Sequence, residues 1–592
     1  MPTEFGKTDD EQLVIDFRRW MVSAEAAHKK WRETFKIDDL DKYWEGDQTP
    51  AWWNEEFFVP INLVFANIQR QLDNLTTVTP YYNVRPDRTY TPIPDLYPQY
   101  EAEAKVRESL LNATVKSRRL RREVRKVALD AYISMGVIKV YYQPYLRKNP
   151  KAGGFIPGSE SREPEYRLFK ENFVVSRRNI KDIRLDPFAD SIENIKKVAE
   201  RLEYTLEEVK SNKLFKNTET LKSIQVRPEE KVEDEQRKQG TNNLQPATGG
   251  NSSHAGFSLG RDREEMVTVW EVYDIENNRI QAFAEGHDLP LRDELMDDSI
   301  DEHSYVFLWY VDRRDTPYPV PGMFHQLGPQ DEYNVTRNQT MLHRRRFNRK
   351  YTYRRGAVKD DALAKLENPH DGVAIPVEAD GEVIRPIADA PLDQAVYFDT
   401  AQLRRDFQDV AGEAVGDSEL AKIEKTGVAN LLSESQQGRV RGARAVFQEF
   451  YESIAEKLMK LYEEELSLPM AVALTGVDGL YWTPISRRSF QAGQATFRYE
   501  VAADSLVPQT PETERASWIA FLQFMALNPN FGANPLLVEK SARAFGVYDK
   551  QIVQEVTRAA QAAIEQQMLM GGGSPGKPGI SSNVGKQMGV PG

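Results

Sequence analysis

The residues of this sequence that could do chemistry most directly form a cluster of basic side chains in the middle of the chain. No acidic residue lies between Glu332 and Asp360. Basic side chains at this density can neutralise the phosphates of a nucleic acid. They can equally pair with acidic residues of a neighbouring subunit, and the residues alone leave both interpretations open. The cluster consists of Arg344, Arg345, Arg346, Arg349, Lys350, Arg354 and Arg355.

Other patterns that could indicate an enzyme are incomplete. The segment GGGSPGKP matches the first part of a phosphate-binding loop, but Pro578 stands where Ser or Thr is required and no strand precedes it. The seven histidines are scattered, without a pair at metal-ligand spacing. The acidic run from Asp293 to Glu302 lacks the glycine and the spacing of a calcium loop, and Asp186-Pro187 is more simply a turn than part of a catalytic carboxylate set. We therefore expect no catalytic centre, no cofactor and no metal site.

Composition narrows the class of protein further. A length of 592 residues suggests about three or four domains. The net charge of −12 is the wrong sign for a protein that holds DNA tightly, and the absence of cysteine excludes disulfides and thiolate chemistry. The N-terminus does not resemble a secretory signal, and no apolar run approaches the roughly 18 residues of a membrane span. We expect a protein that does not enter a membrane.

The basic cluster must be positioned by a helix that begins near Pro329. Pro329 suits a first helical turn, and Asp331 and Glu332 lie near the positive end of the helix dipole. This helix is not cleanly amphipathic, because Val335 and Leu342 share a side with Arg346. Such a helix must lie between neighbours, face solvent or line something anionic.

The rest of the chain predicts an α+β fold that is mainly helical. Apolar spacing predicts a long helix over 439–468, whose stripe includes Phe447, Phe450 and Ile454. Capping and turn signals predict a helix opened by Thr205 and a hairpin over 267–284. Further helices are expected at 9–35, after Pro60, at 100–135, 189–201 and 393–412, and from 511 to about 570. Four segments are expected to be irregular: a turn region at 38–50, a mobile surface insertion at 227–264, a glycine-interrupted segment at 412–438 and a flexible tail at 573–592.

Five stretches, taken in order, resemble the portal (head-tail connector) protein of tailed bacteriophages, particularly the short-tailed-phage type. They cover most of residues 40–465, and the likeness lies in their order rather than in any one motif. They are PINLVFANIQRQLDNLTTVTPYYNVRP, DAYISMGVIKVYYQP, NIKDIRLDPFADSIENIKKVAERLEYTLEEVK, the helix with Gln330, Asn334 and Arg337, and EKTGVANLLSESQQGRV.

The resemblance implies a ring, usually of twelve copies, at one capsid vertex, around a channel through which double-stranded DNA is packaged and ejected. It implies partners as well: the terminase large subunit, a head-tail adaptor, and the major capsid and scaffold proteins. The protein would assemble in the host cytoplasm and remain in the virion. By the family plan the chain divides into a wing (1–325, containing the 227–264 insertion), a first stem helix (326–352), a clip (353–397), a second stem helix (398–412), a tunnel-loop region (413–438), a long wing helix (439–468), wing strands (469–510), a helical crown (511–572) and the tail (573–592).

Within that plan, particular basic residues become candidates for contacts. The arginines would provide only sparse contacts in a mostly repulsive channel, since many phosphate contacts would stop a moving duplex. The candidates to face DNA are Lys422 and Lys425 of the tunnel-loop region with Arg344, Arg345, Arg346, Arg349 and Lys350; the candidates to face the motor or adaptor are Arg354, Arg355 and Lys359. Two other classes stay open: another oligomeric head-tail adaptor or scaffold component, and, with less support, a DNA-processing enzyme.

We predict that replacing both Lys422 and Lys425 with Glu leaves ring assembly intact but impairs DNA packaging or retention, because this segment is proposed to face the duplex. Particle mass measures assembly, and the nuclease-protected DNA in phage heads measures packaging. Normal packaging and retention by the double variant would count against the tunnel-loop assignment.

Overall fold

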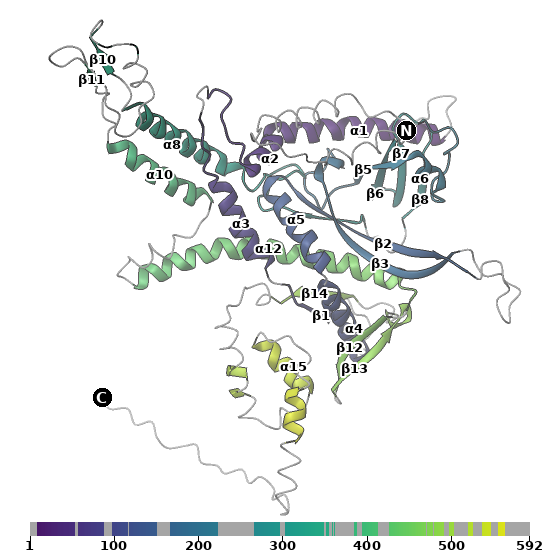
Figure 1. The fold of residues 1–592 in the computed structure, drawn as a ribbon. Coiled ribbons are helices and arrows are strands. Elements are labelled where there is room, and N and C mark those ends of the chain that lie inside the picture. The colour runs from purple at the N-terminus through teal and green to yellow at the C-terminus, as the bar shows by residue number, and fades with distance from the viewer. Residues whose placement is uncertain are drawn as a thin grey trace, which may run out of the picture. The chain divides into compact units, whose positions relative to one another are not determined.

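A computed structural model describes most of the chain. The described residues are 9–53, 57–77, 79–87, 97–116, 118–150, 166–222, 266–296, 302–347, 351–354, 358, 360, 384–386, 394–411, 426–468, 470–476, 479–490, 496–502, 519–521, 523–524, 535–545 and 555–562. Helices take up 51% of the structure and strands 24%, so the chain mixes helices with sheets, compatible with an α+β protein. It divides into unit 1, residues 1–80 and 114–468, and unit 2, residues 81–113 and 469–592 (Figure 1).

An antiparallel five-stranded sheet is the largest sheet of unit 1. Its strand order is β4-β5-β6-β7-β8, so each strand pairs with its neighbour in sequence. The β6–β7 hairpin turns at Asn277 and Asn278, as the sequence predicts, and Asn278 has a positive φ of 52°. The strands are β4 (Ile183–Leu185), β5 (Lys197–Thr205), β6 (Met266–Asp274), β7 (Arg279–Ala284) and β8 (Arg292–Leu295).

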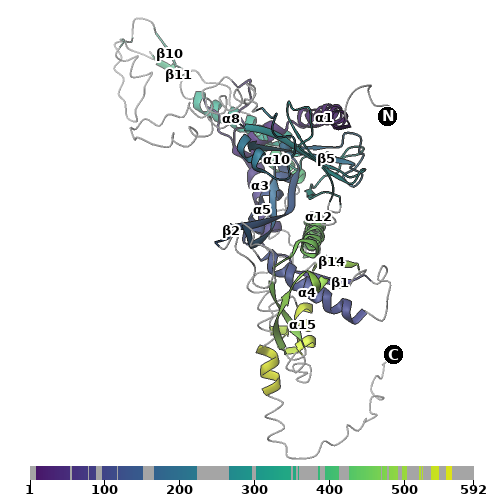
Figure 2. The ribbon, with the colours of Figure 1, turned by 90° about the vertical axis from the view of Figure 1, so that its right-hand side faces the viewer.

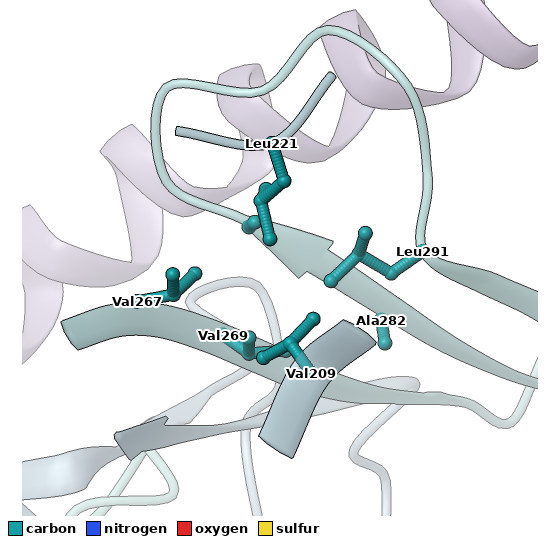
Figure 3. Close-up of a cluster of buried hydrophobic side chains, with 7 residues drawn as sticks. Val209, Leu221, Val267, Val269, Ala282 and Leu291 are labelled. Carbon is teal, nitrogen blue, oxygen red and sulfur yellow. The ribbon is translucent and has the colours of Figure 1, made fainter. Parts of the chain in front are cut away.

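Both faces of this sheet are covered by other parts of unit 1. Successive side chains of β6 point to opposite faces, so the strand contributes to a cluster on each face. Trp270 and Val272 point toward helix α1 (Asp9–Thr34), where Phe17 stacks on Phe283 with ring centroids 4.1 Å apart. On the other face a second cluster gathers around Val209 of helix α6 (Leu206–Ser211) (Figure 3). It contains Val209, Leu221, Val267, Val269, Ala282, Ala284 and Leu291.

A three-stranded sheet of order β3-β2-β9 lies between helices α5 and α12. Helix α12 contacts this sheet, and Tyr462 of α12 packs on Phe173 of β3. The predicted apolar stripe of α12 is buried: Phe447, Phe450 and Ile454 are each at most 3% exposed. The elements are α5 (Arg118–Ile133), β2 (Gly136–Lys148), β3 (Tyr166–Arg178), β9 (Tyr305–Leu308) and α12 (Thr426–Glu465).

A buried ion network joins the two sheets. The Lys139 ammonium of β2 lies 2.6 Å from the Glu200 carboxylate of β5 and 2.5 Å from that of Glu271 on β6. Tyr305 donates to Glu200 and Tyr273 donates to Glu271. Burial by itself lowers the pKa of Lys139, but the nearby Glu271 and Glu200 carboxylates outweigh it and hold that pKa well above its usual value. The two carboxylates thus balance the buried Lys139 ammonium, and the two tyrosine hydroxyls add hydrogen bonds to those carboxylates.

Helix α8 (Leu327–Phe347) contacts α10, α3 and the 3-10 turn η4. Helix α10 (Gln394–Ala411) lies beside α8, and the paired strands β10 (Tyr351–Tyr353) and β11 (Ile384–Pro386) lie beyond their shared end (Figures 1 and 2). Also present are α2 (Ile37–Glu45), α3 (Leu63–Thr76) and the 3-10 turns η2 (Ile180–Asp182) and η4 (Phe324–Gln326).

Unit 2 is built around an antiparallel pair of distant strands, β1 (Tyr82–Pro86) and β14 (Phe497–Val501). Helix α4 (Tyr97–Val115) supplies Arg107, whose guanidinium lies 4.1 Å from the Phe497 ring centroid and donates to the Tyr499 hydroxyl at 2.9 Å. The other elements are β12 (Met470–Gly476), β13 (Gly479–Ile485), η5 (Arg487–Phe490) and α15 (Pro535–Ala544).

Two predicted helices are wrong in extent. The helix expected over 100–135 is two helices, α4 and α5, which are separated after Val115. The expected helix 189–201 is largely absent: its end is β5, which pairs on both sides in the sheet. Strand β2 begins at Gly136, where a Cβ would clash with the Val127 carbonyl. Tertiary pairing overrides local propensity at these places.

Two predicted irregular segments are helical. The expected turn region 38–50 contains α2, which begins after Lys36 in the left-handed region (φ 50°) and ends at Gly46 (φ 94°). Helix α12 begins at Thr426, so Gly427 and Gly438 lie inside a helix rather than interrupting one. The 227–264 insertion and the 573–592 tail lie outside the described residues.

Helices α1 and α10 are confirmed to within one residue of their predicted bounds, and α3 and α6 are the helices expected after Pro60 and Thr205. Thr205 and Glu208 form the predicted capping box. Across the described ranges, no helix is both long and apolar enough to cross a bilayer.

Two buried histidines make the stability of unit 1 depend on pH. Burial lowers the pKa of His28 on α1 and of His303 before β9 from 6.5 to about 3, helped at His28 by the Arg184 and Arg32 charges and at His303 by the Lys457 charge. Each of the two histidines has a lower pKa in the folded protein than in the unfolded chain. Below about pH 6.5 these histidines therefore bind more protons in the unfolded chain than in the folded protein. The contribution of each neutral histidine is therefore complete above pH 6.5 and declines as the pH falls toward 3.

We predict that the free energy of unfolding falls by about 2 kcal/mol per buried histidine between pH 6.5 and about pH 5. The His28→Gln variant should lose correspondingly less over the same interval. Urea denaturation followed by tryptophan fluorescence at several pH values measures this. An equal decline in the variant and the wild type would contradict a neutral His28.

Candidate functional site: helix α8 and its basic end

Four amide residues recur at every fourth position through η4 and α8: Gln326, Gln330, Asn334 and Asn338. Residues four apart lie on one face of a helix. All four side chains are buried, with exposed fractions between 0% and 4%. We call this set the amide stripe. It replaces the apolar stripe that a buried helix face normally carries.

The amide stripe bonds to the backbone of an extended segment, Val59–Leu63. The Val59 N–H donates to the Asn338 side-chain oxygen at 2.8 Å, and the Asn338 side-chain nitrogen donates to the Val59 carbonyl at 3.0 Å. The Ile61 N–H donates to the Asn334 side-chain oxygen at 2.9 Å. Asn334 in turn donates to the buried Gln48 side chain at 2.7 Å.

Gln330 continues this pattern at the start of α3. Its side-chain oxygen accepts from the N–H groups of Leu63 at 2.9 Å and Val64 at 3.2 Å, and its nitrogen donates to the Ile61 carbonyl at 2.8 Å. The first N–H groups of a helix have no partner within the helix. Gln330 therefore caps α3 together with Asn62, whose side chain accepts from Phe65.

The spacing of the amide side chains along α8 matches the spacing of their backbone partners along the Val59–Leu63 segment. Four residues of α-helix advance about 6 Å along the axis, and two residues of extended chain advance about 6.6 Å. Consequently Asn338, Asn334 and Gln330 meet Val59, Ile61 and Leu63 in turn, with the segment running opposite to α8. Pro60 has no N–H, but it falls between bonding positions, so none is lost.

The amide network continues from the stripe to helix α10. Asn67 on α3 donates to Gln326 at 3.1 Å, and Gln71 donates to Asn67 at 3.0 Å and to the Ala411 carbonyl at 3.2 Å. Ala411 is the last residue of α10. One connected set of amides thus links α3, η4, α8, the Val59–Leu63 segment and the end of α10.

A further bond holds the acidic first turns of α8. The Tyr43 hydroxyl of α2 donates to the Asp331 carboxylate. Burial raises the pKa of Asp331, while the Tyr43 hydroxyl partly opposes the increase. Burial also raises the pKa of Tyr43, and the Asp331 carboxylate raises it further. The half of α8 next to η4 is thereby bonded to α2, α3 and the Val59–Leu63 segment.

The basic end of α8 differs from this bonded half. Arg337 and Arg344 on α8 are exposed, as is Arg354 after β10. For Arg345 and Arg346 the structure describes only the helical backbone. The other predicted site residues lie outside the described residues: Arg349, Lys350, Arg355, Lys359, Lys422 and Lys425. The helix therefore carries charge toward the β10–β11 strands, where it can meet an anionic partner.

Sequence reasoning missed the amide stripe, although its signal is present. The sides of this helix mix apolar and charged residues, so apolar periodicity alone predicts no buried face for it. A search for side-chain amides at every fourth position would have identified that face. Gln330 and Asn334 entered the sequence analysis only as part of a family likeness.

No protein-family model matches this chain, and no curated protein sequence matches it. Within the described ranges, no three His, Asp or Glu side chains gather closely enough to hold a metal ion.

We predict that Asn334→Leu lowers the free energy of unfolding by about 3 kcal/mol. The Ile61 N–H and the Gln48 side-chain oxygen would both lose the hydrogen bond that they make with the buried Asn334 side chain. Urea denaturation measures the change. Gln339→Leu is the matched control, since Gln339 is an exposed amide on the same helix, and a surface change of this kind costs less than about 0.5 kcal/mol. Equal stabilities of the two variants would contradict the role given to the stripe.

Proposed function

We propose that this chain is the portal protein of a tailed bacteriophage. In this proposal several copies, twelve by the family plan, form a ring at one capsid vertex. Double-stranded DNA passes through the ring during packaging and ejection, and the clip receives first the terminase and later the tail adaptors. The chain acts by forming and lining a channel, without a catalytic centre.

The observation that carries the proposal is the arrangement around α8 and α10. These helices lie side by side, the segment between them includes the β10–β11 pair beyond their shared end, and the 40-residue helix α12 follows in the chain (Figure 1). A descending helix, a small β-containing tip, a returning helix and a long helix are, in that order, the stem, clip, stem and long wing helix of the family plan. The order of elements supports the proposal independently of sequence likeness.

The exposure of these helices also supports a ring. On α10, Phe407 and Ala411 are buried, whereas Arg404, Arg405 and Val410 are exposed. A helix pair covered on one side only has surface left for the neighbouring copies in a ring.

The charge distribution suits a channel that conducts DNA without retaining it. The chain carries a net charge of −12, while the exposed Arg344 and Arg354 stand at the β10–β11 end of α8. A surface with six to ten phosphate contacts would bind DNA with steep salt dependence and slow its passage. An acidic protein with a few basic positions near the tip avoids that outcome.

Mass photometry of the purified chain, followed by negative-stain imaging, tests the proposal. We expect particles near twelve times 67.8 kDa with a central hole. A compact dimer without a hole would contradict the ring. A smaller closed oligomer lacking a channel wide enough for a duplex would favour an adaptor or scaffold component instead.

A further inference from the structure

Strands β2 and β3 extend beyond the sheet to which they belong. Strand β9 pairs with β2 only from Gly136 to Lys139, whereas β3 pairs with β2 along its full length. Beyond Tyr142 the two strands therefore form a two-stranded ribbon (Figure 1). We call residues 143–148 and 166–170 the distal ribbon.

The root of this ribbon is firmly held. The Glu171 carboxylate accepts from the backbone N–H groups of Ser467 and Leu468, each at 2.9 Å, just after helix α12. Phe173 packs on Tyr462 with ring centroids 4.0 Å apart. The end of α12 thus fixes the direction in which the distal ribbon leaves unit 1.

The distal ribbon exposes large apolar side chains and positive charge together. Tyr145, Leu146, Tyr166 and Phe169 have exposed fractions of 52%, 54%, 51% and 48%. Arg147, Lys148, Arg167 and Lys170 are also exposed, and these two ranges contain no acidic residue. The Arg147 guanidinium lies 3.9 Å from the Phe169 ring centroid, and Tyr145 packs edge-on against Phe169 at 6.1 Å.

Such a surface is unfavourable in isolation. A two-stranded ribbon is only marginally stable in water without a further strand or a packed face. Contiguous exposed apolar side chains on a soluble protein mark an interaction site. Aromatic residues and arginine are also the types that contribute most of the binding energy at protein interfaces.

We propose that the distal ribbon docks on an acidic surface of a second copy of this chain. The chain carries −12 in total while residues 143–148 and 166–170 carry four positive charges and no negative one, so the rest of the chain carries −16 and is of opposite sign to the ribbon. A second copy supplies this charge together with apolar surface for Tyr145 and Phe169. The inference deepens the proposed ring, on which it rests, by naming a contact between its copies.

Double-stranded DNA fits this surface less well. A duplex would satisfy the four basic side chains through its phosphates. It offers little apolar surface for the Tyr145–Phe169 pair, and the net charge of −12 repels it. Protection of the ribbon by DNA is therefore an outcome that the experiment must separate from protection by a second copy.

Thiol labelling tests the contact cleanly, because the chain has no cysteine. Leu146→Cys places a single thiol on the ribbon, and Leu214→Cys places one at a matched exposure of 51% against 54% elsewhere in unit 1. In the isolated oligomer we expect maleimide to label the thiol at position 146 at least tenfold more slowly than in the monomer fraction. The thiol at position 214 should react equally in both.

A charge-reversal variant provides the second measurement. Replacing Arg147, Lys148, Arg167 and Lys170 with Glu should raise the protein concentration needed for half-assembly at least tenfold, as measured by mass photometry. The control replaces Lys30, Lys210, Lys213 and Lys222 with Glu, which changes the net charge equally at exposed positions outside the ribbon. The control should assemble as the wild type does.

The outcomes separate this inference from the proposed function. Holed rings in which the thiol at position 146 reacts as fast as in monomers would overturn the ribbon contact and leave the portal proposal intact. A chain that never associates would overturn both. Protection of that thiol in monomers by a duplex oligonucleotide, without protection in the oligomer, would overturn the second copy in favour of DNA.

Discussion

Hydrogen bonds between the amide stripe and the backbone of Val59–Leu63 are the interaction on which the arrangement around α8 depends. A segment that packs against a helix must find partners for the N–H and C=O groups that it turns away from water. Here α8 supplies them from side chains at every fourth position, in the place where a neighbouring strand would ordinarily do so. The same residues fill the buried face of α8, so helix and segment specify each other's position.

This constraint explains how one helix can be both buried and strongly basic. The amide stripe and Asp331 occupy the half of α8 next to η4 and bond it to α2 and α3. The basic residues follow at the other end, where Arg344 is exposed. A rigidly held root and an exposed charged end are what a helix needs if it is to carry charge toward a partner. In the proposed portal, that partner is DNA, the motor or the adjacent copy.

The sequence predicts those parts of the fold in which local signals and tertiary packing agree. The α12 stripe through Phe447, the Thr205 capping box and the Asn277-Asn278 hairpin are such places. It fails where a distant partner determines the structure, as in β5, which is paired with a strand on each side. It also misses the break between α4 and α5. For the site, the sequence identified the exposed charges of α8 but not its buried face, because amides have no apolar periodicity.

Backbone amide hydrogen exchange, resolved by residue, tests the central claim about the amide stripe most directly. Val59 and Ile61 lie in a segment without regular secondary structure, and Leu63 is the first residue of α3, yet the N–H group of each donates to a buried side-chain amide. We predict that they exchange as slowly as the interior amides of α3, because all must wait for the same local opening. Exchange at the rate of an unstructured peptide at these three positions would contradict the account.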